Sequence, residues 1–327
     1  MTEDIAALVR QLAATERADR REASERLVAL GAPAVGHLLP LLREPIGTAR
    51  SAAESCVERL GEPGLAALRK VRVEGPGQFR ATALRVLADT GGADALSPAD
   101  RAAVERLVRV KLPDEAPDDL PIHAWIAVPG ADVTAILAAL ELHDARPVTT
   151  AMGVSAAVDH ENSLTEEAPD GSETTAYRVF ISPEFEGWRL LYGTDYVNEN
   201  WAQAVEKLST HCREAHFYVV DEYNRSWVWS VWENGRVTRG YSTYGDPQWE
   251  GEPLEFERDL VLDEDDEMYD PEEAAAYADG VRDPEEVASA LSIQPTTVGV
   301  LDKVGHGWLA VTDPDVGHGR FRGALPV

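Results

Sequence analysis

Clustered carboxylates are the residues of this sequence whose type and spacing most directly suggest chemistry. Residues 250–286 contain seventeen acidic side chains, and Arg258 and Arg282 are the only basic ones among them. The densest run, Asp263–Glu267, offers the hard oxygen ligands that Ca²⁺ binds. An EF-hand loop needs glycine at its sixth position and glutamate at its twelfth, and this run has neither spacing. We therefore expect a solvated acidic surface and no bound metal.

Histidine and cysteine side chains are the second group of candidates. His211, Cys212 and His216 suggest a zinc ligand set or a thiol nucleophile, but adjacent helix residues diverge and no second pair completes four ligands. Two Gly-His-Gly turns, at residues 305–307 and 317–319, are explained equally well by glycine-rich turn chemistry. The sequence contains no phosphate loop, dinucleotide fingerprint or nucleophile elbow. We expect no catalytic residue and no cofactor, and an enzyme using carboxylate or histidine chemistry in the second part of the chain stays open as an alternative.

The charge of the chain is divided unevenly between two parts. Residues 1–112 carry 17 basic and 15 acidic side chains, a net of +2, whereas residues 113–327 carry 13 basic and 43 acidic ones, a net of −30. Between them, residues 113–122 hold three prolines and four acidic residues, which is typical of an extended linker. We therefore expect two domains, 1–112 and 123–327, joined by that linker.

Composition also excludes several classes of partner. The N-terminal residues lack the basic, apolar and cleavage regions of a signal peptide, and no apolar run reaches the about 20 residues of a membrane span. Cys56 and Cys212 are the only cysteines, so there is no disulfide framework. A net of +2 in the first part is too weak a field for nucleic acid. We expect a soluble cytoplasmic protein that binds neither nucleic acid nor membrane.

Three segments of the first part align without gaps at a period of thirty residues, and apolar residues recur within each at helical spacing. The positions in register are Arg20, Arg50 and Arg80; Ala23, Ala53 and Ala83; and Gly31, Gly61 and Gly91. A glycine after the last apolar residue favours a left-handed helix end. Each unit is then helix, turn and helix, and the units must stack because none buries its apolar face alone.

The Arg-x-x-Ala pattern ending in Leu-Gly resembles the short HEAT-like repeat of the phycobilisome-lyase type over roughly residues 16–95. The resemblance implies an α-solenoid and no particular activity, since such repeats serve scaffolds, lyases and DNA glycosylases alike. The aligned arginines fit either a basic stripe for phosphate or an acidic partner, or structural bonds to helix ends. The repeat pattern favours the structural role.

The second part changes from helical to mixed periodicity, which predicts an α+β domain with a mainly antiparallel sheet and helices on one face. The expected strands are 123–128, 177–182, 187–192, 217–220, 226–232 and 236–241. The expected helices are 132–142 and 201–211. Residues 148–158 are small and β-prone, and we expect residues 159–174 to form a loop. The segment 179–193, the tryptophan-rich strands and residues 290–299 resemble a group of uncharacterised bacterial proteins over roughly residues 120–325, which carries no catalytic residue across.

The Asn234–Gly235 pair predicts a two-residue type I′ hairpin turn, because both positions of that turn need positive φ. The turn sets Trp232 opposite Val237, Trp229 opposite Gly240 and Val228 opposite Tyr241. Trp227 and Trp229 then share one face of the strand and Trp232 points to the other. Large aromatic side chains on both faces indicate either a central strand or a face that binds a partner, and a core sheet covered by the two helices is favoured.

These patterns favour a non-enzymatic protein-binding protein whose acidic domain captures a basic protein. An inhibitor or immunity protein against a cationic toxin or nuclease is one concrete version, because complementary charge speeds capture. The expected partner-binding residues are Asp263, Asp265 and Asp266 through their charge, and Trp227 and Trp249 as desolvated anchors. An assembly scaffold whose solenoid groove binds a helix or peptide stays open.

Overall fold

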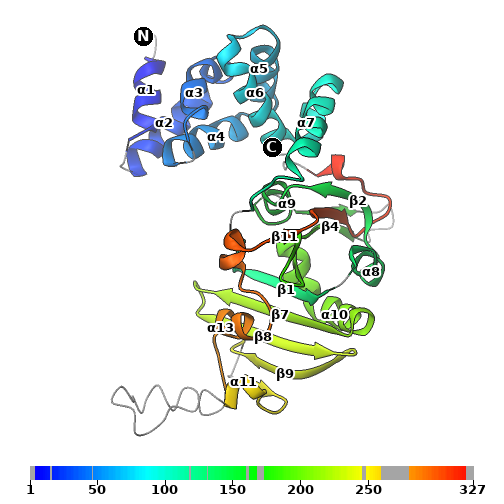
Figure 1. Ribbon diagram of the computed structural model, residues 1–327. Helices are drawn as coiled ribbons and strands as arrows, with labels where there is room; N and C mark the ends of the chain where they lie inside the picture. The colour runs from blue at the N-terminus through cyan, green and yellow to red at the C-terminus, as the bar shows by residue number, and fades with distance from the viewer. Residues whose placement is uncertain are drawn as a thin grey trace. The chain divides into compact units, whose positions relative to one another are not determined.

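The computed structural model describes residues 4–14, 17–45, 47–117, 119–130, 132–159, 162–167, 173–244, 248–258 and 280–321 (Figure 1). These residues form two compact units, 4–109 and 110–321. The first is helical, and the second combines helices with an antiparallel sheet, so the expected order of a helical part and an α+β part is confirmed. The segment expected as a linker packs within the second unit, where Leu120 is buried and donates its backbone N–H to Pro295 O at 2.9 Å.

Helices of the first unit pack against one another, among them α1 with α2, α3 with α4 and α5 with α6. The helices are α1 (Ile5–Leu12), α2 (Arg17–Leu30), α3 (Val35–Leu42), α4 (Thr48–Leu60), α5 (Glu62–Glu74), α6 (Gly77–Gly91) and α7 (Pro98–Lys111), with 3₁₀ turns at Ala32–Ala34 and Gly92–Ala95. The aligned alanines Ala23, Ala53 and Ala83 are completely buried. Their small side chains leave room for the close approach of neighbouring helices, as α2 and α4, and α4 and α6, approach here.

Glycines at the helix ends adopt positive φ in all three repeats, with one shift of position. Gly31 and Gly61 have φ of 74° and 58°, as the repeat pattern predicts. In the third repeat Gly91 still belongs to α6 at φ −111°, and Gly92 takes the positive φ of 60°. The assignment of Gly91 to that turn is wrong by one residue, because the helix extends one position further before the chain reverses.

The aligned arginines of the repeats bond within the helical framework. Arg20 donates to Ala14 O and Arg80 donates to Gly75 O, each at 2.9 Å, so both satisfy carbonyls at the end of a preceding helix. Arg50 instead pairs with Glu54 at 2.8 Å. Glu54 also accepts from Arg85, thirty-one residues later, at 2.7 Å. These contacts support the structural role of the arginines.

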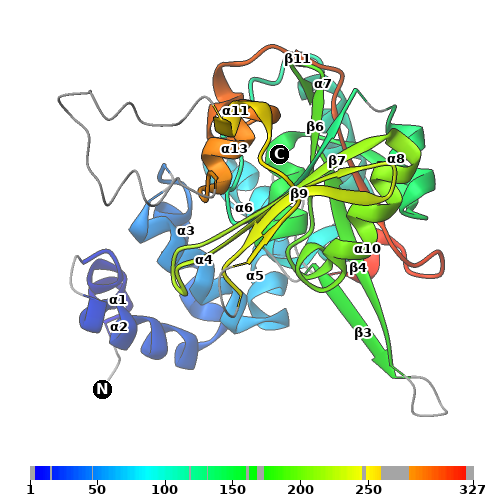
Figure 2. The ribbon, with the colours of Figure 1, turned by 90° about the horizontal axis from the view of Figure 1, so that it is seen from below.

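The second unit is built on one long antiparallel sheet, ordered β10-β9-β8-β7-β1-β6-β4-β12-β2 among the described residues (Figures 1 and 2). Its strands are β1 (Ala124–Pro129), β2 (His143–Val148), β4 (Glu173–Ile181), β6 (Trp188–Tyr192), β7 (Glu214–Asp221), β8 (Ser226–Glu233), β9 (Arg236–Ser242), β10 (Gln248–Glu250) and β12 (Gly307–Val311). The short strands β5 (Glu184–Phe185) and β11 (Lys303–Val304) pair with each other. The first half of β4 pairs with β3 (Ser163–Glu167) in a two-stranded ribbon (Figure 2).

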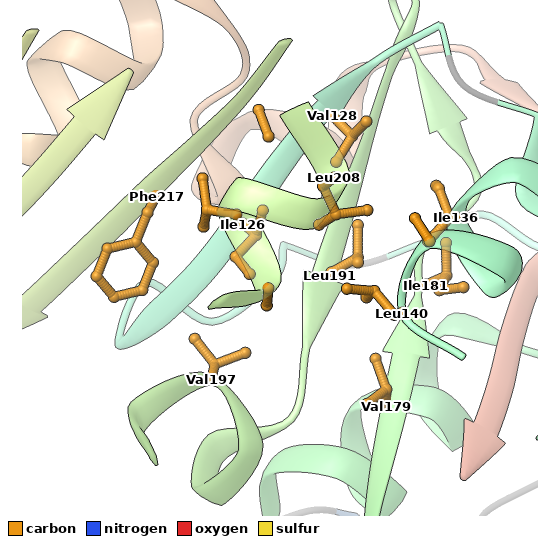
Figure 3. Packing of buried hydrophobic residues seen from close by; sticks show 14 of the residues in the cluster. Ile126, Val128, Ile136, Leu140, Val179, Ile181, Leu191, Val197, Leu208 and Phe217 are labelled. Carbon is orange, nitrogen blue, oxygen red and sulfur yellow. The ribbon is translucent and has the colours of Figure 1, made fainter. Parts of the chain in front are cut away.

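One face of the sheet is aliphatic and is covered by α8 (Val133–Ala139) and α10 (Thr194–Cys212) (Figure 3). Ile126 and Val128 from β1, Leu191 from β6 and Phe217 from β7 meet Leu208 and the other buried residues of this core. Alternation along each strand sends every second side chain to this face, so the residues between them must be covered from the opposite side.

The opposite face carries one aromatic residue from each of seven neighbouring strands. The row is Phe180, Tyr192, Trp125, Tyr218, Trp229, Tyr241 and Trp249. Helix α13 (Pro284–Leu291) packs over β7 and β8, and α9 (Thr150–Val154) packs over β4 and β12. The expectation of helices on one face is therefore wrong: the aromatic row is a second apolar surface that needs its own cover.

Two further expectations are corrected in this part of the chain. Residues 150–159 are helical rather than β-prone, because Thr149 caps α9 by accepting from Met152 N at 3.3 Å. Part of the expected loop 159–174 is strand β3, whose Thr165 pairs with Thr175 through a 3.0 Å hydroxyl hydrogen bond. The alternation needed for a strand is hidden there by polar side chains on both faces.

The Asn234–Gly235 turn is confirmed, with φ of 51° and 77°. Trp232 pairs with Val237 as predicted, but beyond it the register shifts by one residue, and Trp229 faces Tyr241 rather than Gly240. Val228 likewise faces Ser242 rather than Tyr241. A β-bulge opposite Val231 causes the shift, and it places Tyr241 in the aromatic row. Trp232 packs against the aliphatic core, on the face opposite Trp229, as expected.

Candidate functional site

Three exposed aromatic side chains lie at the end of the sheet where β7 and β9 end and β8 begins, and we call them the strand-end aromatics: Tyr223, Trp227 and Tyr244. Tyr223 lies in the turn between β7 and β8, and Trp227 is the second residue of β8. The Thr243 backbone N–H donates to Trp227 O at 3.0 Å and the Trp227 N–H donates to the Thr243 hydroxyl, which brings Tyr244 to the same end of the sheet. Their exposed fractions are 94%, 39% and 59%.

Exposed aromatic side chains at one end of a sheet are unusual in a domain that otherwise buries its aromatic row. Residues of this size contribute strongly to interfaces because they bury a large apolar area with few rotatable bonds. The Trp227 backbone is fixed by Thr243, because the Trp227 N–H donates to Thr243 Oγ1 at 2.8 Å. An incoming partner would therefore meet a side chain on an ordered strand rather than on a free loop.

Acidic groups lie beside the strand-end aromatics. Asp221 accepts hydrogen bonds from the backbone N–H of Asn224 at 3.0 Å and from its side-chain amide at 2.7 Å. These bonds lower the pKa of Asp221, so the carboxylate is charged at neutral pH. The pKa of Tyr244 is raised by burial of part of its ring and by the Asp221 carboxylate. The surface thus combines apolar rings with negative charge.

Trp249, the other expected anchor, has a different environment. Its ring lies against Tyr241, with centroids 4.4 Å apart, and the Arg239 guanidinium carbon sits 4.2 Å from its centre. Trp249 is half-buried, and Trp227, with an exposed fraction of 39%, is the more exposed of the two expected anchors.

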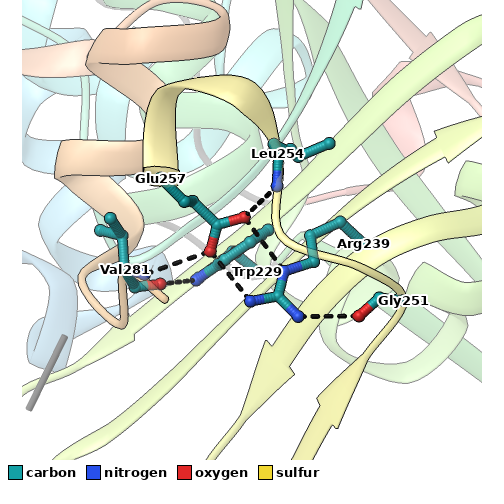
Figure 4. A network of polar contacts seen from close by, with 6 residues as sticks. All are labelled: Trp229, Arg239, Gly251, Leu254, Glu257 and Val281. Carbon is teal, nitrogen blue, oxygen red and sulfur yellow. Dashed lines mark hydrogen bonds and ion pairs between the residues drawn. The ribbon is translucent and has the colours of Figure 1, made fainter. Parts of the chain in front are cut away.

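Arg239 and Glu257 form a buried ion pair beside Trp249 (Figure 4). Both Glu257 oxygens accept from Arg239 at 3.0 Å, and they also accept from the backbone N–H groups of Leu254 at 2.7 Å and Val281 at 3.2 Å. Arg239 donates a further bond to Gly251 O at 2.9 Å. The pair therefore ties the chain before residue 258 to the chain after residue 280, in the way a structural clamp does.

The three aspartates expected to attract a basic partner, Asp263, Asp265 and Asp266, lie outside the described residues. Within residues 259–279 the sequence has ten acidic side chains and no lysine or arginine. Glu257 and Val281, which are joined by a hydrogen bond, flank this stretch in the sequence.

A second polar group lies on the aromatic face beneath α13, and sequence reasoning missed it. His216 is buried at 1% exposure between Glu214 and Tyr218, the alternate residues of β7. Its Nε2 lies 2.7 Å from Glu214 Oε1, its Nδ1 lies 3.0 Å from Tyr218 Oη, and Tyr218 Oη lies 3.0 Å from Ser292 Oγ. We call these four residues the relay chain. The alternating Glu-x-His-x-Tyr pattern of residues 214–218 is a local signal that places Glu214, His216 and Tyr218 on one face of a strand, whereas Ser292 joins them only through the fold.

Aromatic rings enclose the relay chain. Trp125 stacks on Tyr218 with centroids 4.9 Å apart, and Trp188 lies 5.0 Å from the His216 ring. Burial raises the pKa of Tyr218 far above its ordinary value, so its phenol stays protonated. The hydrogen bond from His216 lowers the pKa of Glu214, which is therefore a carboxylate.

The other histidines and the cysteine that could carry chemistry are kept apart. His211 is exposed on α10, where its Nδ1 lies 2.8 Å from Lys207 O, and Cys212 packs against the aliphatic core. His306 contacts the ring of Trp308, whereas His318 is buried against Asp144 O at 2.8 Å. Across the described ranges, no three His, Cys, Asp or Glu side chains gather in a group that could hold a metal ion.

Comparison with protein-family models, with curated proteins and with solved structures finds no match to this chain. Among the helices that the structure describes, none has the length and apolar character needed to cross a membrane.

Proposed function

We propose that this chain is a non-enzymatic binding protein whose acidic domain captures a basic protein, in the manner of an inhibitor or immunity protein. The observation that carries the proposal is the group of strand-end aromatics beside Asp221 on a domain with a net charge of −30 over residues 113–327. Trp227 acts as the anchor, and the carboxylates, Asp263, Asp265 and Asp266 among them, act at longer range.

The two kinds of residue have different roles in such a complex. Surface carboxylates steer a cationic partner and raise the association rate, and their effect declines with salt because the Debye length falls to about 8 Å at 0.15 M. A desolvated tryptophan instead slows dissociation, since its removal typically costs about 2 kcal/mol or more at the centre of an interface. The surface charge therefore determines the association rate, and the aromatic surface determines the dissociation rate.

In this proposal the first unit is a HEAT-like α-solenoid joined to the acidic domain, and the protein acts in the cytoplasm. Hydrogen bonds separated by about one repeat support the stacked arrangement, among them Arg59 to Ser24 Oγ at 2.8 Å and Arg72 to Asp100 at 2.8 Å. Arg72 lies on α5 and Asp100 on α7, so these bonds link helices that are not adjacent in the chain.

One observation favours the scaffold alternative, in which the helical unit binds a helix or peptide. Val73 and Leu107 are exposed by 70% and 39% on α5 and α7. An apolar segment of a partner would bury them.

Affinity capture from the native host with the full chain tests the proposal. We expect the wild-type protein to enrich one strongly basic protein at low salt, and the Trp227→Ala variant to lose it. Trp232→Ala is not a suitable control, because Trp232 packs against the core, so Tyr223→Phe, which keeps the exposed ring, serves instead. Enrichment of an acidic or neutral partner that Val73→Asp abolishes would contradict the proposal in favour of the scaffold.

A further inference from the structure

The turn between β8 and β9 contains an asparagine that can react with its own backbone. Of the five asparagines in the chain, Asn234 alone is followed by glycine. Its side chain is exposed, and the two turn residues Asn234 and Gly235 have φ of 51° and 77°. Because glycine has no Cβ, nothing on Gly235 hinders the approach of its backbone nitrogen to the asparagine side chain. The pair therefore has the residue types that favour deamidation.

The reaction proceeds through a cyclic imide. The Gly235 nitrogen bonds to Asn234 Cγ and closes a five-membered succinimide ring. The Cγ–Nδ2 bond breaks, and the side-chain nitrogen leaves as ammonia with the proton that the Gly235 nitrogen has lost. Water then opens the ring at one of its two carbonyls, which gives aspartate or isoaspartate. Water is the only co-reactant, and no group is oxidised or reduced.

The folded turn holds both of its backbone amides against α10. The Gly235 N–H donates to Ser209 Oγ at 3.1 Å. The buried Ser209 hydroxyl itself donates to Glu206 O at 3.1 Å, which leaves its oxygen free to act as the acceptor. The Asn234 N–H donates to Arg213 O at 2.8 Å. The nitrogen that would attack is therefore already engaged in a hydrogen bond.

These bonds oppose the geometry that the reaction needs. Reacting atoms must come to about 3–3.5 Å in the right alignment, so the Gly235 peptide plane has to turn away from Ser209 and toward Asn234 Cγ. The turn also has little room for that rotation, because a Cβ added at Gly235 would lie only 2.6 Å from Thr210 Oγ1. Loss of the Ser209 hydrogen bond is thus a necessary step before ring closure.

We propose that Asn234 is a site of spontaneous deamidation and that the hydrogen bond from Gly235 to Ser209 keeps the reaction slow in the folded protein. Either product adds one negative charge to the turn. Isoaspartate also adds a carbon to the main chain, which moves Gly235 relative to Ser209 and disturbs the pairing of Glu233 with Arg236 that closes the hairpin.

Incubation of the full chain in heavy-oxygen water at a constant, mildly alkaline pH, followed by tryptic peptide mass spectrometry, tests this proposal. Peptide 226–236 contains Asn234, and peptide 214–225 contains Asn224 as an internal control. We expect peptide 226–236 to convert slowly to aspartate and isoaspartate with one heavy oxygen incorporated, while peptide 214–225 stays unchanged. The same chain unfolded in urea should convert faster at Asn234.

Two variants of α10 separate the Ser209 hydrogen bond from general loosening of the helix. Ser209→Ala should speed conversion in the folded protein by about 3- to 10-fold, the factor that corresponds to the net free energy of one hydrogen bond. Thr210→Ala removes the neighbouring hydroxyl, which donates to the same Glu206 carbonyl at 2.8 Å, and should convert at the wild-type rate. Circular dichroism checks that both variants are folded.

Three results would overturn the proposal: an unfolded chain that does not convert, a folded wild type that converts as fast as the unfolded chain, or equal rates for Ser209→Ala and Thr210→Ala. The comparison of folded and unfolded wild type needs no variant. The turn follows the end of β8, whereas Trp227 lies at its start, so each of these results leaves the binding of a basic protein through Trp227 unaffected.

Discussion

His318 should make the stability of the second unit depend on pH. The ring is 8% exposed, its Nε2 bonds to Asp144 O at 2.8 Å, and its backbone carbonyl accepts from Arg178 at 2.8 Å. Burial, together with the nearby positive charges of Arg146 and Arg178, lowers the pKa of His318 from 6.5 to about 4, against the opposing effect of Asp144. The folded protein therefore holds this imidazole neutral.

The sign and size of the effect follow from that shift. Because the pKa is lowered on folding, the unfolded chain binds more protons between pH 6.5 and 4, so the contribution is complete above pH 6.5 and is lost as pH falls toward 4. Integrating the two titrations gives a loss of about 2 kcal/mol at pH 5 and about 3 kcal/mol at pH 4, relative to pH 7.

Denaturant unfolding of the wild type and of His318→Gln from pH 7 to pH 4 measures this contribution. Glutamine can still donate to Asp144 O but takes up no proton, so the variant should be modestly less stable at pH 7 and should overtake the wild type below about pH 5. Carboxylates that titrate in this range and lie far from His318 affect both proteins and cancel in the difference. Asp144 does not cancel, because His318 contributes to the lowering of the Asp144 pKa. Parallel stability curves for the two proteins would refute the reasoning.

Three further outcomes are expected. Gly61→Ala should destabilise the helical unit by about 1–3 kcal/mol in thermal melting followed at 222 nm, because a backbone with φ 58° and ψ −139° suits only glycine. Gly36→Ala is the control: a Cβ added at this position of α3 meets no atom within 4 Å, so the variant should be neutral or more stable. Arg239→Met should cost about 3–5 kcal/mol by leaving the buried Glu257 carboxylate without its cation, and adding Glu257→Leu should recover only part, since two backbone N–H groups then lose their acceptor. EDTA should leave the melting temperature unchanged, and a drop of several degrees reversed by Ca²⁺ or Zn²⁺ would show that a metal site was missed.

Local chemistry was sufficient to predict the turns and most of the elements. Asn234–Gly235 fixes its hairpin because the two φ values are a property of those residues alone. The same reasoning failed three residues further along, where the register shifts at the bulge opposite Val231, next to Arg239, which contacts Trp249 and pairs with Glu257. The contacts of Arg239 involve residues that are distant in sequence, which a local turn rule does not include.

The candidate sites divide in the same way. Trp227 is exposed because it lies at the start of β8, away from the residues that α13 covers. The sequence alone predicts that Trp227 could be an anchor, but not that its side chain is exposed. The sequence predicts Trp249 as an anchor on equal grounds, but its ring lies against Arg239. Ser292 is seventy-four residues from Tyr218, so no local pattern could join it to His216.

The most direct test of the proposed function is the binding kinetics of the captured basic protein on the immobilised full chain, measured at several salt concentrations. Reversing Asp263, Asp265 and Asp266 to Lys should slow association, and Trp227→Ala should mainly speed dissociation. Association of the wild type should slow steeply as salt rises above about 0.15 M. Binding that is independent of salt and is lost when Arg20, Arg50 and Arg80 are replaced would contradict the proposal and assign the function to the helical unit.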